Sequence, residues 1–454
     1  MSKQNSDGIY DARELGVGKT LVLGLQHMFA MFGATVLVPI LTGLSISTTL
    51  LFAGLGTLLF HFVTKRKVPA FLGSSFAFLG GYAAIAPLID GASNTAAIPY
   101  ACLGVAFAGL LYFVLAALIK AFGTSKVMRF FPPIVTGPII IAIGLTLSSS
   151  AIANCTDCWW LAVVTILVVI VCNIFGKGMI KIIPILIGVV VSYAIGAATG
   201  KVDWTGVKEA AWVGLPIIKE NTVFYVFGNG FDTSLFVTAL ITIVPIALAT
   251  IVEHIGDISA ISSTVGKNFI KEPGLHRTLV GDGAATILAS LFGAPANTTY
   301  GENTGVLALS KVYDPLVIEI AAAFAIVFSF CPKFAAVISA MPTATIGGIS
   351  LILYGMISAI GVRNMVESKV DFSKSRNVMI AALILVLAIG INYSTEGAIN
   401  FSIGKVDISL SGLAVGSLVG IIVNAILPGK DYTFDEPEVP EEAEAPAVDS
   451  EKEE

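Results

Sequence analysis

The sequence predicts an all-α membrane protein that crosses the bilayer many times, and three observations lead to this fold class: its composition, the placement of its basic residues and an internal repeat. Of the 454 residues, 56% are apolar and only 13% are charged, and the mean hydropathy is +0.88. A soluble protein carries about twice that fraction of charged residues, because its surface has to face water. Lipid is therefore the solvent that suits this chain.

Fourteen segments of the sequence are apolar enough to be membrane spans. A bilayer core takes roughly 20 residues of helix, and fewer where a helix is broken. The third and tenth segments are interrupted by small and β-branched residues, which predicts a short extended stretch that leads into a half-helix in each. The expected spans are 20–44, 47–64, 71–91, 98–120, 130–150, 158–176, 181–199, 233–253, 279–293, 297–312, 315–335, 337–360, 377–394 and 409–428.

Polar sequence lies before, between and after these spans. Residues 1–18 are polar, no cleavable signal peptide is apparent, and the first span is expected to stay as an anchor. The loop at 201–232 contains aromatic and β-branched residues, which favour short strands. Residues 429–454 are rich in Glu, Pro and Ala, and this composition predicts a disordered acidic tail.

The basic residues give the orientation, because Lys and Arg collect in cytoplasmic loops. With the N-terminus inside and 14 spans, only five of the 26 basic residues fall outside, which leaves 21 inside. Both termini are therefore expected in the cytoplasm, with the chain in the plasma (inner) membrane. The five exceptions are Lys201, Lys208, Lys219, Lys333 and Lys405.

An internal repeat is indicated by three landmarks that recur in the same order in the two halves of the chain. Because seven spans is an odd number, the second half would enter the membrane from the opposite face, and 19–200 and 233–428 would form an inverted repeat. Transporters with this architecture bind their substrate near the middle of the membrane, at broken spans. The landmarks are His27 and His254 at an offset of 227, Pro69 and Pro295 at 226, and Pro132 and Pro342 at 210.

Three carboxylates in or near the ends of the predicted spans are candidates for function, since an ionisable residue within a span costs roughly 2.5–3.5 kcal/mol. Glu302 lies at the break of the tenth span, where it can accept hydrogen bonds from ring N–H groups or cap its own half-helix. Glu253 and Asp257 are four residues apart, on one helical face near the inner end of the eighth span. Like charges on one face disfavour joint ionisation, which suits a proton carrier. The alternative for Asp257 is a solvated position in the cytoplasmic loop.

Other polar and thiol groups are less specific. Gln26 and His27 lie within the first span, where a lone His is more often a hydrogen-bonded structural residue, and Asp282 in the ninth span is either a coupling or a structural carboxylate. Of the five cysteines only Cys155 and Cys158 are close together, and no second pair or nearby His completes a metal site. We expect no metal and no other cofactor.

Several motifs together resemble the nucleobase–ascorbate (nucleobase–cation) symporter family, and within it the bacterial uracil permease branch. The motifs are LQHMFAMFGATVLVP, FLGSSFAF, EHIGD, EPGLHR and NTTYGENTGV, and the resemblance runs from about residue 18 to 428. NTTYGEN is the most specific, because xanthine and urate relatives usually carry Gln–Asn in place of Glu302–Asn303. Ser310 departs from the family, which normally has Thr before the basic residue.

The resemblance implies a binding site and a division of the fold. Glu302 and Glu253 would hydrogen-bond a pyrimidine, helped by the backbone N–H groups of Phe76 and Gly301. Spans 1–4 and 8–11 would form a core domain, and spans 5–7 and 12–14 a gate domain. Asp257 stands where a well-known uracil permease has His, so its coupling role is left open. The pocket would further be lined by Ala34, Ser75, Tyr300 and Tyr354.

These observations predict a secondary transporter that imports uracil by proton symport. Its partners would be uracil, protons and the lipid bilayer, with a homodimer possible and no nucleic acid. Uptake of xanthine or urate on the same fold is the main alternative. An anion exchanger or channel is disfavoured, because two acids at the site would repel an anion. An enzyme is disfavoured too, since no nucleophile or metal constellation is found at the repeat breaks.

Overall fold

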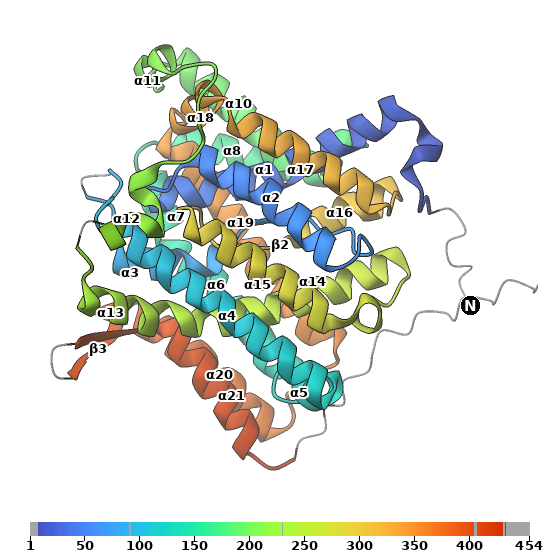
Figure 1. The fold of residues 1–454 in the computed structure, drawn as a ribbon, viewed down its shortest axis with the longest axis vertical. Helices are drawn as coiled ribbons and strands as arrows, with labels where there is room; N and C mark the ends of the chain where they lie inside the picture. The colour runs from blue at the N-terminus through green and yellow to red at the C-terminus, as the bar shows by residue number, and fades with distance from the viewer. Residues whose placement is uncertain (1–7, 90–91, 229, 404–405, 430–431, 433–454) are drawn as a thin grey trace, which may run out of the picture.

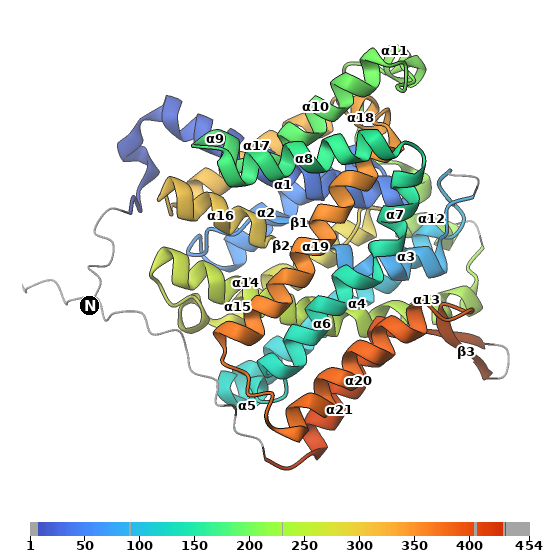
Figure 2. The same cartoon turned by 180° about the vertical axis from the view of Figure 1, so that it is seen from behind.

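The structure is a computed structural model, which describes residues 8–89, 92–228, 230–403, 406–429 and 432. The chain forms a bundle of helices around two short strands, and a second strand pair lies at the edge of the bundle (Figures 1 and 2). The prediction of a mostly helical membrane protein is confirmed at this level. The expected tail at 429–454 lies, apart from Gly429 and Tyr432, outside the described residues.

The first half of the chain contains α1 to α12 and strand β1, with bounds as follows. The elements are α1 (Val17–Thr42), α2 (Ile46–Val63), β1 (Leu72–Ser74), α3 (Leu79–Ile85), α4 (Ile98–Phe122), α5 (Thr124–Met128), α6 (Pro133–Thr146), α7 (Ser148–Thr156), α8 (Trp159–Phe175), α9 (Met179–Ile182), α10 (Pro184–Ala198), α11 (Thr205–Glu209) and α12 (Val223–Gly228).

The second half contains α13 to α21 and three strands. The elements are α13 (Thr233–Ile243), α14 (Ala247–Val265), α15 (Leu275–Leu291), β2 (Asn297–Thr299), α16 (Gly301–Ser310), α17 (Pro315–Ser329), α18 (Pro332–Ser339), α19 (Thr343–Glu367), α20 (Ser375–Asn392), β3 (Ala398–Ile403), β4 (Val406–Ser411) and α21 (Gly412–Ile426).

Seven helical segments are each long and apolar enough to cross a membrane, and α17 with α18, bent by 88°, gives an eighth candidate among the described residues. Four shorter apolar helices, including α8, α10 and α21, accompany them. The chain is therefore a multi-pass membrane protein. The seven segments are Val17–Thr42, Ile46–Val63, Ile98–Phe122, Pro133–Thr156, Thr233–Val265, Thr343–Glu367 and Ser375–Asn392.

Strands β1 and β2 join the two halves of the chain at the centre of the bundle. They pair antiparallel, with Leu72 opposite Thr299 and Ser74 opposite Asn297. A backbone hydrogen bond from the N–H of Ser75 to the carbonyl of Ala296 (3.0 Å) extends the pairing past the strands. Helix α3 lies on one side of the strand pair and α16 on the other in both views (Figures 1 and 2).

The helices pack most extensively within two groups. In one group α4 packs on α15 and α13, while α17 packs on α2 and α1. In the other group α6 crosses α19, α8 packs on α10, and α20 packs on α21. We call these the strand group (α1–α4 and α13–α17) and the crossing group (α6–α10 and α19–α21). The strand group surrounds β1 and β2, so the central strand pair belongs to it.

The two helices at the heart of the crossing group both begin directly after a proline. Pro132 is the N-cap of α6, and Pro342 is the N-cap of α19. Proline has no N–H to leave unpaired at a helix start, and its fixed φ suits the first turn. The landmark that these prolines made in the sequence therefore marks the same local structure twice.

Two of the predictions from the sequence are wrong. The eighth span does not end near Glu253, because α14 continues to Val265. The second half of α14 carries Asp257, Ser259 and Ser262, which lowers its hydropathy, yet these residues are buried or half-buried. The loop at 201–232 forms short helices, including α11 and α12, and no strand in the part of it that the structure describes.

The described residues before α1 form a strap across the face of the bundle where the chain begins. Ile9 bridges Val312 through backbone bonds of 2.8 Å to Lys311 and Tyr313. The hydroxyl of Tyr10 donates to the carbonyl of Val265 at 2.7 Å. These residues, Ile9–Ala12, therefore tie the end of α14 to the end of α16, and we call them the N-terminal strap.

An ion pair connects two loops on this same face. Lys67, after α2, forms an ion pair with Glu272, in the connection from α14 to α15. Hydrogen bonding from Lys67, followed by its charge, holds the pKa of the Glu272 carboxyl below its usual range. Both side chains are largely exposed, so this pair contributes little to the free energy of unfolding.

Candidate functional site

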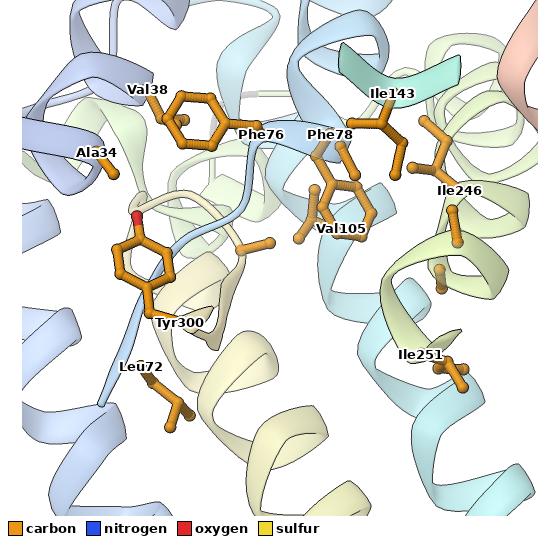
Figure 3. Close-up of a cluster of buried hydrophobic side chains, with 14 of the residues drawn as sticks. Ala34, Val38, Leu72, Phe76, Phe78, Val105, Ile143, Ile246, Ile251 and Tyr300 are labelled. Atoms are coloured by element: carbon orange, nitrogen blue, oxygen red, sulfur yellow. The ribbon is translucent and has the colours of Figure 1, made fainter. Parts of the chain in front are cut away.

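The candidate site is built around the central strand pair, where backbone groups meet side chains from α1 and α14. Figure 3 shows the Tyr300 ring between β1 and α1, with its hydroxyl toward Ala34. That hydroxyl donates to the carbonyl of Ser74 at 2.7 Å and lies 3.4 Å from Thr35 Oγ1. A β-carbon at Gly73 would lie 2.6 Å from the Tyr300 ring, so β1 requires glycine there.

The chain after β1 presents an aromatic side chain between the strand group and the crossing group. Phe76 follows directly after Ser75, and both are buried. The Phe76 ring meets that of Tyr354, on α19, edge to face, with centroids 5.8 Å apart. In Figure 3 Phe76 also lies next to Val38 of α1. Phe76 therefore stands where a planar ligand beside the strand pair would meet an aromatic surface.

Two carboxylates lie on the face of α14 that turns toward α16. Glu253 and Asp257 are half-buried and one helical turn apart. Asp257 Oδ1 lies 3.0 Å from the position that a β-carbon on Gly301 would take, so this carboxylate reaches the first residue of α16. Negative charge is stabilised at a helix N-terminus, typically by 0.3–1 kcal/mol. Asp257 therefore lies within α14. The alternative, a solvated position in a cytoplasmic loop, is wrong.

Twelve residues of α14 follow Glu253 before the helix ends at Val265. At a rise of 1.5 Å per residue this is about 18 Å of helix. Glu253 consequently sits deep in the bundle, at the level where β2 gives way to α16.

Glu302 is the second residue of α16, but its side chain lies outside the described part of the structure. Its backbone belongs to the first turn, whose N–H groups have no partner within their own helix. Tyr300 precedes this turn in an extended conformation and donates its N–H to the carbonyl of Phe71 at 3.0 Å. The site thus offers helix N–H donors and carboxylates within one short segment.

Behind the strand pair, on the other side of α14, lies a fully buried pair of ionisable residues. His254 Nδ1 is 2.5 Å from Asp282 Oδ2, and both side chains have no exposed surface. His254 Nδ1 is also 3.1 Å from Thr299 Oγ1, and Nε2 is 3.0 Å from Thr278 Oγ1. Asp282 Oδ2 accepts the backbone N–H of Thr299 at 3.4 Å. Asp282 is therefore tied to both α14 and β2.

A second contact ties α16 to α1. Asn303 Nδ2 donates to the carbonyl of His27 at 3.2 Å and lies 3.3 Å from His27 Nδ1. Gln26, the neighbour of His27, is buried as well. His27 thus holds the first turn of α16 against α1, which is a positioning contact.

A small pocket opens beside Phe76, between the strand group and the crossing group. Its walls carry apolar side chains and three polar residues, and the amide of one of them, Asn392, donates to the carbonyl of Thr146 at 3.1 Å. The lining residues are Phe76, Ala77, Gly80, Ile143, Thr146, Leu147, Ile246, Asn392, Ser411 and Leu413.

The structure brings most of the predicted site residues to one region. Those on β1, α14, α16 and the adjoining turns meet around the strand pair, with Ala34 on α1 and Tyr354 on α19 facing them. The sequence analysis missed His254, whose partners lie 24, 28 and 45 residues further along the chain. Its only signal was its place beside Glu253 in a repeated motif. Among the described residues no group of three His, Cys, Asp or Glu could hold a metal ion.

Solved structures of two other proteins have a fold similar to that of this chain. The transmembrane domain of a cyanobacterial bicarbonate transporter, BicA, matches with a TM-score of 0.58 and 16% identity, over 92% of this chain and 99% of that one. The structure of SLC26A9 matches with a TM-score of 0.60 and 14% identity, over 91% of this chain and 66% of that one. At these identities the likeness concerns the fold alone.

Sequence similarity identifies the family of the chain. A uracil permease of Bacillus caldolyticus is 43% identical, over 91% of this chain and 93% of that protein. A uracil permease of Escherichia coli (strain K12) is 38% identical over 90% and 91%, and a putative pyrimidine permease of the same strain is 38% identical over 94% and 93%. The model of a permease family matches residues 18–397. The chain therefore belongs to this permease family, that of the nucleobase–ascorbate transporters.

Proposed function

We propose that this protein is a secondary active transporter that imports uracil by proton symport. One observation carries the proposal: the carboxylate face of α14 meets the N-terminus of α16 beside the central strand pair, deep in the bundle. Its relatives at 38–43% identity are named as uracil permeases.

Uracil is a planar, neutral ring that offers two N–H donors and two carbonyl acceptors. Carboxylates at Glu253 and Glu302 would accept the ring N–H groups. Backbone N–H groups of Gly301, at the start of α16, and of Phe76, after β1, would donate to the ring carbonyls. The ring of Phe76 would pack on the face of the base, since aromatic pairs favour stacked or edge-to-face contact.

Proton coupling would use the same face of α14. Glu253 and Asp257 are one turn apart, and Glu302 follows Gly301, which Asp257 contacts. Three carboxylates in a confined space disfavour full ionisation, so a proton bound there lowers the electrostatic repulsion. Because uracil is neutral, binding it leaves this proton in place, and both can be carried in one cycle.

The proposal includes 14 spans in a seven-plus-seven inverted repeat. The eight span candidates, the four shorter apolar helices, α15 and α16 make up this number. Helix packing supports the symmetry. In the two halves α4 corresponds to α17, α15 to α2, and α13 to α1. The contacts of α4 with α15 and α13 are therefore the equivalents of those of α17 with α2 and α1. At the offset of 226, Leu72 corresponds to Thr298, and Thr299 corresponds to Gly73. Leu72 pairs with Thr299, and the equivalent residues Thr298 and Gly73 are also paired.

In this scheme the strand group is the core domain and the crossing group is the gate domain. The placement of basic residues supports a cytoplasmic position for the N-terminal strap, with the protein in the plasma membrane. Substrate would reach the strand pair from either side as one group moves against the other, as in other transporters built from inverted repeats.

The test is uptake of labelled uracil by the purified full-length protein in liposomes. We expect accumulation above the external concentration when the outside is acidic, its loss when a protonophore collapses the gradient, and none in protein-free liposomes. Equilibration that ignores the gradient would remove the proton from the proposal. Accumulation of labelled xanthine without accumulation of labelled uracil would replace the substrate by a purine.

A further inference from the structure

The His254–Asp282 pair has no part in the binding contacts described above, yet it is the most deeply buried ionisable pair among the described residues. Both side chains are fully buried, and the two atoms His254 Nδ1 and Asp282 Oδ2 are 2.5 Å apart. Two such groups are costly to remove from water. Asp282 Oδ1 is buried without a hydrogen-bond partner among the described residues, so Asp282 Oδ2 and the imidazole make the contacts of the pair. The partners of this pair show what it holds together.

Every polar contact of the pair runs between α14, α15 and β2. The imidazole reaches Thr278, on α15, through Nε2, and Thr299, on β2, through Nδ1. Asp282 accepts the backbone N–H of Thr299. Thr286, one turn after Asp282, donates to the carbonyl of Asn297 at 3.0 Å. Strand β2 is thus held from behind at both of its ends.

The elements on either side of the pair are those of the proposed binding site. His254 directly follows Glu253 on α14, and Thr299 comes immediately before Tyr300 and Gly301. A shift of β2 relative to α14 would therefore change the separation between the Glu253 carboxylate and the first turn of α16. Hydrogen bonds lose strength steeply once their distance and angle depart from the optimum, so this separation decides how a small rigid ligand binds.

We propose that the His254–Asp282 pair is a positioning element that sets the distance between α14 and the β2–α16 junction, and so the geometry of the uracil site. The inference rests on the function proposed above. His254 and Asp282 touch no substrate in this scheme. They act through Thr299 and through the helix that carries Glu253.

Two variants of His254 separate positioning from simple packing. In His254→Asn the amide nitrogen can take the place of Nδ1 and keep the contact with Asp282. In His254→Gln the amide reaches toward the place of Nε2, and the contact with Asp282 is lost. Tyr112→Phe is the matched control, because it removes another buried hydrogen bond beside the His254 ring, to Thr250 (2.7 Å), without touching β2.

The first measurement is uracil binding by calorimetry, with thermal unfolding of the ligand-free protein alongside. We expect the Kd of His254→Gln to rise roughly tenfold or more, as for the loss of one buried charge-assisted hydrogen bond. His254→Asn should stay within a few-fold of wild type. Tyr112→Phe should unfold at a lower temperature with its Kd unchanged. Equal Kd values for the two His254 variants, or a Kd that only follows the unfolding temperature, would overturn the proposal.

The second measurement needs no ligand, so it separates this inference from the proposed function. Hydrogen exchange of the backbone N–H groups at 297–304 reports directly on the β2–α16 junction. His254→Gln should speed exchange there and at β1, which is hydrogen-bonded to β2, while a distant segment in α20 keeps its rates. Unchanged exchange at 297–304 would overturn the positioning role even if uracil transport is established. Faster exchange with no uracil binding by the wild-type protein would uphold it and refute the proposed substrate.

Discussion

Glu253 is the residue on which most of the proposed chemistry depends, and α14 explains why. One face of this helix carries Glu253 and Asp257 toward α16, and the next residue, His254, turns into the protein interior. A single helix thus presents a half-buried carboxylate to the ligand site and a fully buried imidazole to the strand behind it. In the proposed scheme, substrate, proton and backbone geometry are therefore linked through adjacent side chains.

We expect Glu253→Gln to bind uracil but to lose accumulation driven by the proton gradient. The amide keeps an acceptor oxygen for the base, whereas it has no proton to exchange. Binding and uphill uptake measured on the same reconstituted preparation give the comparison. Normal uphill uptake by this variant would move the proton site to another group.

We expect Glu302→Gln to weaken uracil binding by roughly 10- to 100-fold, since a hydrogen bond to a charged group contributes about 1.5–3 kcal/mol. The amide also presents a donor to the N–H groups of the base. Calorimetry on the purified variant measures the loss. Glu220→Gln, in an exposed part of the long loop, is the control and should bind as wild type does. Unchanged affinity in Glu302→Gln would contradict the assigned pocket.

At this scale the sequence pointed to the carboxylates, Asp282 among them, and missed the imidazole of His254 that pairs with Asp282. Glu253, Asp257 and Glu302 stood out because a charge inside an apolar run needs a reason. His254 did not, since its partners come from α15 and β2, and only the folded chain brings them together. Its position beside Glu253 gave no indication that it faces the opposite way.

Among the elements, the crossing of α6 and α19 shows how closely the helices of the crossing group approach. A β-carbon on Gly361 would lie 2.6 Å from the carbonyl oxygen of Gly137 and 2.8 Å from the amide nitrogen of Ile141. Small residues permit such an approach between helices in a membrane, where packing replaces the hydrophobic effect as the source of association. The crossing is therefore fixed by backbone contact.

We expect Gly361→Leu to lower the free energy of unfolding by about 1–3 kcal/mol, because the added side chain forces the two helices apart. Gly355→Leu, on the same helix but facing open space, is the matched control and should unfold like the wild type. Thermal unfolding of both variants in detergent provides the measurement. Equal stability of the two variants would show that the helices can separate at no cost.

Two features of the elements were not predicted from hydropathy: the end of α14 and the β3–β4 hairpin. The long apolar helices were located closely, but α14 was ended twelve residues early because its polar residues are buried against neighbours and not exposed. The β3–β4 hairpin was not predicted, since it lies in a short connection that alternates too briefly to separate from a loop. Burial inside the protein is a tertiary property that local hydropathy does not report.

For the whole molecule, the arrangement of the two helix groups matters more than any one helix. The β3–β4 hairpin extends from α20 and α21 of the crossing group and packs against α13 of the strand group. Thr242, on α13, donates to the carbonyl of Ser409, on β4, at 2.8 Å. If the groups move against each other during transport, this contact has to break or shift.

We expect a covalent link between Thr242→Cys and Ser409→Cys, made with a short bifunctional reagent in a background without the native cysteines, to stop uptake while uracil binding remains. A link between Ser148→Cys and Tyr393→Cys lies inside the crossing group and should leave uptake intact. Uptake and binding before and after linking are the readouts. Full uptake with the first link in place would show that the hairpin and α13 move as one body.

The proposed inverted repeat was indicated in the sequence by three landmarks at nearly constant offsets, and the prolines of the third landmark are both N-caps of helices, α6 and α19. What the landmarks could not give is the contact between the halves. The N-terminal strap, which ties the ends of α14 and α16, was likewise hidden in a polar segment of ordinary composition. Offsets identify equivalent positions, but they do not identify neighbours.

The pairing of β1 with β2 has a consequence for how the protein is made. Leu72 pairs with Thr299, which the ribosome delivers 227 residues later. At a synthesis rate of about 5–20 residues per second, the first strand waits roughly 10–45 seconds for its partner. During that time its backbone N–H and carbonyl groups would be unpaired in a hydrocarbon environment, which a spanning segment does not tolerate. The region around β1 must therefore remain at the translocon, at the membrane surface or under a chaperone until the second half of the chain arrives.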